Sequence, residues 1–142
     1  MNISKFKKWN NLIGFITFLI AFITYSLTVE PTASYWDAAE YISTSAKLQV
    51  GHPPGAPFFQ MLGAFFASFA SNPDQIAFMV NMMSVFASAF TILFLFLTIT
   101  IIGKKIVLKN NSISNSNAII ILGSSLIGSL CFTFSDSFWF NA

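Results

Sequence analysis

Long apolar runs separated by short polar stretches dominate the chain. A helix needs about 20 apolar residues to cross the roughly 30 Å hydrocarbon core of a bilayer. Three runs reach or approach that length, and we predict a membrane-spanning helix for each: residues 12–29, 76–102 and 118–134. The pattern therefore predicts an all-α integral membrane protein.

A fourth apolar run, residues 56–70, is shorter and rich in Phe and small residues. As a helix it would be roughly 22 Å long, which is too short to span. We predict that it lies in the membrane interface or packs re-entrantly. Pro31 ends the first span, because proline has no backbone N–H to donate to a continuing helix.

Residues 36–50 predict a second, amphipathic interfacial helix. Its apolar stripe is Trp36, Ala39, Ile42, Ala46 and Val50, and its polar stripe is Asp37, Glu40, Thr44 and Lys47. A helix with two such faces is suited to lying on a membrane or packing against other helices. The prolines and glycines of residues 51–55 break it.

Composition and charge set the class and the orientation. Only 8% of the residues are charged and 55% are hydrophobic, whereas soluble domains carry about 25% charged residues. All seven basic residues are lysines: three precede the first span, three follow residue 102, and Lys47 lies between the two clusters. The positive-inside rule places both clusters in the cytoplasm. The chain has no polybasic array, so we expect no nucleic-acid partner.

The lysines also fix the layout. If residues 56–70 spanned the membrane, the second lysine cluster would lie outside, so three spans fit and four do not. The remaining segments are then a cytoplasmic N-terminus (1–11), an external loop (30–75), a cytoplasmic loop (103–117) and the start of a second external segment (135–142).

Asp37 and Glu40 are the first candidates for chemistry, because acids are rare here and these two share a helix face at i, i+3. A carboxylate at the outer membrane boundary can act as a general base on a hydroxyl. Equally, the two acids can simply solvate the exposed face of an interfacial helix. The residues alone leave both readings open.

His52 and Lys47 are candidate substrate-binding residues. His52 can bind a phosphate, or a metal together with the acids, but no paired-histidine spacing supports a metal, and we predict neither metal nor cofactor. Lys47 can neutralise a lipid phosphate or snorkel to the headgroups. Trp36 and Tyr41 hold positions typical of an aromatic belt, and we include them among the candidates.

The strings WDAAEYI (36–42), KLQVGHPPGAP (47–57) and SDSFWF (135–140) carry a family resemblance. They resemble the start of large bacterial membrane proteins, common in Bacteroidetes, that bear a domain-of-unknown-function label. Those proteins are related to the eukaryotic transmembrane O-mannosyltransferase that modifies plexin-type receptor domains. They belong to the membrane glycosyltransferases of the GT-C fold, which use lipid-phosphate sugars.

The resemblance implies a function. It makes Asp37 the base that deprotonates a Ser/Thr hydroxyl of an acceptor protein. The hydroxyl then attacks a polyprenyl-phosphate-linked sugar, mannose in our prediction, with inversion. Glu40 would orient or assist, and His52 and Lys47 would lie near the phosphate. The implied location is the bacterial inner membrane, with the loop carrying these residues in the periplasm.

Family members are far longer, so we expect this chain to be an N-terminal fragment that is inactive by itself. A second hypothesis is a non-catalytic membrane protein that binds lipid or a partner through its external amphipathic segment. A third, part of a transporter or flippase, would need charged or broken helices at mid-membrane depth. The spans contain no acid, lysine or histidine near their centres.

Overall fold

Helices make up almost all of the regular structure. The computed structural model describes residues 1–34, 37–107, 113–140 and 142, and contains no strand within these ranges. The elements are α1 (Ile3–Thr28), α2 (Ala38–Lys47), α3 (Pro57–Ala67), the 3₁₀ helix η1 (Pro73–Gln75), α4 (Ile76–Val107), α5 (Asn115–Thr133) and α6 (Asp136–Trp139). Three of the described helices, in Ile3–Thr28, Pro73–Val107 and Asn115–Thr133, are long and apolar enough to cross a membrane. The predicted all-α class with three such helices is confirmed.

The helix ends differ from the predicted bounds. α1 begins at Ile3 rather than residue 12, so its lysines lie on the helix. α4 continues to Val107 rather than ending at residue 102, and its last turn carries Lys104 and Lys105, whose charges favour a helix C-terminus. Lysine is a good helix former, so these ends extend past the apolar runs. Which side of the membrane each segment faces stays a prediction.

The first turn of α5 shows why that helix starts before the predicted residue 118. Ser114 is its N-cap, and the Ser114 side chain accepts a hydrogen bond from the Asn117 N–H at 3.1 Å. This bond satisfies one of the backbone donors left open at a helix start. α5 therefore begins at Asn115, in the polar stretch that we had predicted to be loop.

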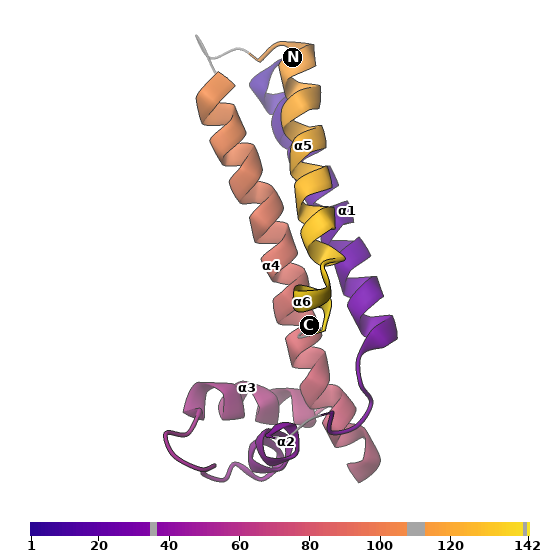
Figure 1. Ribbon diagram of the computed structural model, residues 1–142, viewed down its shortest axis with the longest axis vertical. Coiled ribbons are helices and arrows are strands. Elements are labelled where there is room, and N and C mark those ends of the chain that lie inside the picture. The colour runs from indigo at the N-terminus through magenta and orange to yellow at the C-terminus, as the bar shows by residue number, and fades with distance from the viewer. Residues whose placement is uncertain (35–36, 108–112, 141) are drawn as a thin grey trace. The chain divides into compact units, whose positions relative to one another are not determined.

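The chain divides into two units. One, here called the bundle unit, comprises Met1–Tyr25 and Ser88–Ala142; the other, the hairpin unit, comprises Ser26–Ala87. In the bundle unit α1, the later part of α4, and α5 run alongside one another (Figure 1). Glycines permit this packing: a Cβ at Gly14 would lie 3.2 Å from Leu93 and Phe96, and one at Gly103 would lie 3.3 Å from Ile121.

Small and hydroxyl-bearing residues share the interior of the bundle unit with a cluster of large apolar side chains. Ser125, Ser129 and Thr133 of α5 are fully buried, and each hydroxyl donates to the carbonyl four residues earlier at 2.7–2.9 Å. Tyr25 of α1 donates its hydroxyl to the Thr133 carbonyl at 3.0 Å. Large apolar side chains such as Phe94 and Ile127 point outward and are more than 60% exposed. This arrangement suits helices surrounded by lipid, where small residues allow close packing.

The hairpin unit contains α2 and α3, which pack against each other (Figure 1). They approach closely at Gly63 of α3, where an added Cβ would lie 2.6 Å from Ser45 Oγ and 2.8 Å from Ser45 Cβ. Asn81, at the start of α4, donates to the carbonyls of Glu30 and Thr32 at 2.8 and 2.9 Å. These contacts hold the segment after α1 and the α2–α3 hairpin within one unit.

Substituting Gly63 with Val should loosen the α2–α3 hairpin, because the added side chain overlaps Ser45. Overpacking of this kind costs about 1–3 kcal/mol. We expect faster amide hydrogen exchange in residues 38–67 of the Gly63→Val protein, and partial recovery when Ser45 is also changed to Gly. Gly123→Val is the control, since a Cβ at Gly123 meets nothing within 4 Å. Exchange equal to wild type in Gly63→Val would show that the close approach is not needed.

Candidate functional site

The chain reverses direction between α2 and α3, and this reversal builds the site. Leu48 ends α2 by adopting a left-handed conformation with φ of 50°. The N–H groups of Leu48 and Gln49 then return to the carbonyls of Ser45 and Thr44 at 3.2 and 2.8 Å. These bonds satisfy carbonyls that the end of the helix leaves open. The predicted helix over 36–50 is therefore shorter, and residues 48–50 belong to the turn.

A second turn follows at once. The Gly55 N–H donates to the His52 carbonyl at 2.9 Å, and Gly55 has a φ of +75°, which glycine adopts without strain. Pro57 then opens α3 at a position where its missing N–H costs nothing. The two turns bring His52 back to the first turn of α2.

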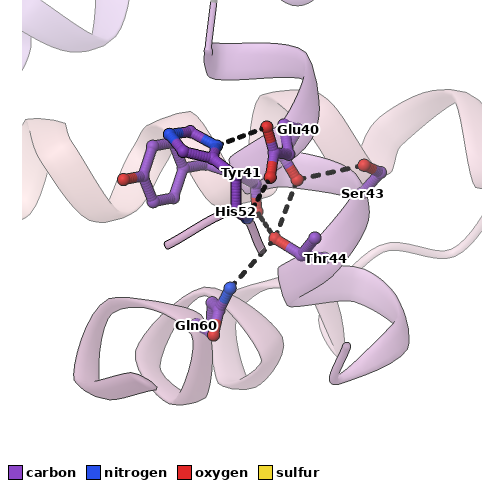
Figure 2. Close-up of polar contacts among 6 residues, drawn as sticks. All are labelled: Glu40, Tyr41, Ser43, Thr44, His52 and Gln60. Atoms are coloured by element: carbon purple, nitrogen blue, oxygen red, sulfur yellow. Dashed lines mark hydrogen bonds and ion pairs between the residues drawn. The ribbon is translucent and has the colours of Figure 1, made fainter. Parts of the chain in front are cut away.

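Glu40 and His52 form the centre of the site through two contacts (Figure 2). The His52 backbone N–H donates to Glu40 Oε1 at 2.7 Å, and His52 Nδ1 lies 2.8 Å from Glu40 Oε2. Both carboxylate oxygens are therefore engaged by one residue. With Nδ1 turned toward the carboxylate, Nε2 is the imidazole nitrogen left for another partner.

The contact shifts both pKa values. The pKa of Glu40 is lowered, first because its carboxylate accepts the His52 backbone N–H and then because it contacts the imidazole. The pKa of His52 is raised, chiefly by the hydrogen bond to Glu40, then by the charge of Glu40, with a smaller effect from the charge of Asp37. The ion pair is therefore complete between these two pKa values. Its contribution is lost as the pH falls through the lowered pKa of Glu40 or rises through the raised pKa of His52.

Solvent reaches the pair. The side chains of His52 and Glu40 are 51% and 38% exposed. Exposed ion pairs add little to global stability. The contact matters instead because it fixes where the imidazole points.

Asp37 occupies the N-cap position of α2, but its side chain makes no capping hydrogen bond. Its backbone carbonyl accepts the Tyr41 N–H at 3.0 Å. The residue is exposed, and its carboxylate is near enough to His52 to contribute to the raised pKa of that imidazole. Asp37 and Glu40 thus differ in partners, although they are neighbours on one helix.

A buried polar side chain of α3, Gln60, lies next to the pair without contacting it directly. Gln60 is 7% exposed, and its Nε2 donates to Thr44 Oγ1 at 3.3 Å; Thr44 in turn donates to the Glu40 carbonyl at 2.8 Å (Figure 2). Our reading of the sequence did not single out Gln60. The signal was present, because Gln60 is the one strongly polar side chain in the apolar run of α3.

The polar stripe of α2 packs toward α3 only at Thr44, while Asp37 and Lys47 at its two ends are exposed. Thr44 and Ser45 are buried, whereas Val50, from the predicted apolar stripe, is 91% exposed. Glu40 is partly exposed, but it does more than solvate a helix face. Its carboxylate is engaged by the loop that follows the same helix.

The other predicted residues take different positions. Tyr41 packs against Phe59 of α3, with ring centroids 5.2 Å apart. Lys47 is exposed in the last turn of α2, about 10 Å along the helix from Glu40. Trp36 lies outside the described residues. Among the described residues, no group of three His, Cys, Asp or Glu side chains is placed to hold a metal ion.

Comparison with known proteins gives the family. Residues 37–142 match the family described as "Protein O-mannosyl-transferase TMEM260 N-terminal domain", which covers more than half of the chain. The chain belongs to this family. The predicted relation to the O-mannosyltransferase family is therefore confirmed, and the matched residues include Asp37, Glu40, Lys47 and His52.

A curated relative agrees with this placement. The protein "Protein O-mannosyl-transferase tmem260" of Dictyostelium discoideum is 34% identical over 85 residues, which are 59% of this chain and 10% of the relative. The chain thus spans about a tenth of the length of that relative. No solved structure matches the chain.

The Glu40–His52 contact can be tested by the titration of His52. Replacing Glu40 with Gln removes the negative charge and weakens the hydrogen bond, so we expect the pKa of His52 to fall toward its ordinary value of 6.5. The chain has one histidine, so NMR of histidine-labelled protein reports this residue alone. Asp74→Asn, a change in the 3₁₀ helix, is the control and should leave the titration as in wild type. An unchanged midpoint in Glu40→Gln would rule out the contact.

Proposed function

We propose that the chain is the N-terminal part of a GT-C-class membrane glycosyltransferase. It would move a sugar, mannose, from a polyprenyl-phosphate donor to a Ser or Thr hydroxyl of an acceptor protein. The family and the relative's name, a protein O-mannosyl-transferase, support the reaction class. The proposal concerns a longer polypeptide, because the chain corresponds to a tenth of that relative. By itself we expect it to be inactive.

One observation carries the division of roles: the two acids have different partners. Glu40 is engaged through both carboxylate oxygens by His52, while the Asp37 carboxylate makes no capping bond and is exposed. A general base must reach the proton that it removes. We therefore assign Asp37 as the base and Glu40 as the residue that orients His52.

The transfer of the sugar needs a group that accepts one proton and a leaving group that accepts an electron pair. Asp37 takes the proton of the acceptor hydroxyl while the hydroxyl oxygen forms a bond to the anomeric carbon of the sugar. The bond from that carbon to the phosphate oxygen breaks, and its electron pair leaves with the polyprenyl phosphate. Attack from the face opposite the phosphate inverts the configuration. The sugar's new bond is therefore to the acceptor, and the proton rests on Asp37.

His52 and Lys47 supply positive charge for the phosphate in this proposal. The raised pKa of His52 favours the imidazolium, whose Nε2–H can donate to a phosphate oxygen. Lys47 is a point charge farther along the same helix. Tyr41 lies one residue after Glu40 and remains a candidate for contact with the sugar. Further cationic groups would come from parts of the longer protein.

Replacing Asp37 with Asn tests the base. In the full-length protein that carries this domain, we expect transfer of mannose from a polyprenyl-phosphate donor to fall by about 10²–10⁴-fold, the usual contribution of a general base. Asp74→Asn is the matched control, since Asp74 is an exposed acid of the same unit in the 3₁₀ helix. Near-normal transfer by a well-expressed Asp37→Asn protein would refute the assignment.

The proposed location is the bacterial inner membrane, with the N-terminus in the cytoplasm and residues 30–75 in the periplasm. Single cysteines test this orientation once Cys131 has been changed to Ala. Ser71→Cys and Ser116→Cys place the same side chain at two exposed positions. A membrane-impermeant maleimide should label Ser71→Cys in cells with a permeabilised outer membrane and Ser116→Cys only after lysis. The reverse pattern would invert the topology.

A further inference from the structure

Gly51 comes directly before His52 and occupies a crowded position. A Cβ at Gly51 would lie 3.1 Å from Glu40 Oε1 and 3.2 Å from Gln60 Nε2. Gly51 does not adopt the left-handed backbone seen at Gly55. The reason for glycine is therefore space and not backbone conformation.

Both neighbours are already engaged in hydrogen bonds. Glu40 Oε1 is the oxygen that accepts the His52 N–H at 2.7 Å, so moving it away lengthens the contact at the centre of the site. Gln60 is buried, and its Nε2 is tied to Thr44 Oγ1 at 3.3 Å. Thr44 donates to the Glu40 carbonyl at 2.8 Å, which closes the network on α2.

We propose that Gly51 is a positioning residue: its missing side chain lets the loop settle between Glu40 and Gln60, so that His52 meets Glu40 through both its backbone and its ring. The Gln60 amide is the second group that limits the space at Gly51. The loop then holds the imidazole with Nδ1 toward Glu40 and Nε2 away from it.

The consequence for chemistry rests on the proposed function. There, Nε2 of His52 faces the donor phosphate, so a displaced loop would move the positive charge away from the leaving group. The positioning itself does not rest on that function. It concerns only the contact between His52 and Glu40, which can be measured without any transfer.

The titration of His52 measures the positioning directly. The charged groups near the imidazole are Glu40 and Asp37, both from the start of α2, and α3 carries no charged residue. In Gly51→Ala and Gly51→Val we expect the midpoint of His52, followed by NMR in the 142-residue chain, to fall toward 6.5. Gly123→Ala is the matched control, because a Cβ there meets nothing within 4 Å.

A rescue separates a steric effect from general damage. Gln60→Ala removes one of the two groups that a Cβ at Gly51 would crowd. Gly51→Ala combined with Gln60→Ala should therefore recover much of the wild-type titration midpoint of His52. Gln60→Ala alone should titrate close to wild type, since the Glu40–His52 contact remains. Circular dichroism checks that each variant stays helical. A wild-type midpoint in Gly51→Ala and Gly51→Val, or no recovery in the double variant, would overturn the proposal.

The full-length protein distinguishes this inference from the proposed function. If both stand, Gly51→Ala lowers mannosyl transfer on the order of tenfold or more, as misplacement of a group in an active site does, and Gly123→Ala does not. If the midpoint of His52 shifts while wild-type protein transfers no sugar, the positioning stands and the proposed function fails. If the midpoint stays, the positioning fails whatever the transfer assay shows.

Discussion

Two contacts from one carboxylate organise the candidate site. Glu40 receives the backbone N–H and the ring of His52 at 2.7 and 2.8 Å, although the two residues lie at opposite ends of the α2 helix-and-turn segment. The contact requires the chain to reverse sharply after α2. Leu48 in the left-handed conformation and the turn closed by Gly55 provide that reversal.

The packing of α2 against α3 places further polar groups next to this contact. Gly63 lets α3 approach Ser45, and this approach brings Gln60 under Thr44 and beside Gly51. Polar groups thus meet between the two helices, while Phe58 and Met61 of α3 remain 74% and 67% exposed. A helix pair with polar contacts between its helices and large apolar side chains on its outer surface is suited to the edge of a bilayer, where that surface meets lipid.

In the bundle unit, too, polar side chains are hydrogen-bonded in the interior and many apolar side chains are exposed. Serines and threonines on α5 satisfy their hydroxyls on their own helix, and large apolar side chains face outward. In a hydrocarbon solvent there is no hydrophobic gain from burying those side chains, so small residues and hydrogen bonds decide which faces pack. The low charge content and the many exposed apolar side chains therefore have one cause.

Much was decided by the sequence alone. The lengths of the apolar runs determined the all-α membrane class and the three candidate spans, because the thickness of a bilayer fixes how many residues a helix needs. The strings around Asp37 and His52 pointed to the family. The rarity of acids singled out Asp37 and Glu40, but helical periodicity could not tell their roles apart, since i, i+3 neighbours share one face.

Only the tertiary structure separated these two acids. Periodicity tells which residues share a face, not what that face meets, so it left unknown that Thr44 in the polar stripe of α2 meets Gln60 of α3. Likewise, no local pattern shows that a loop folds back. The partner of Glu40, His52, lies on such a loop, and Gly51 and Gln60 lie close to the contact. Contacts between residues distant along the chain depend on turn geometry and close packing, which a one-dimensional pattern of polar and apolar residues does not contain.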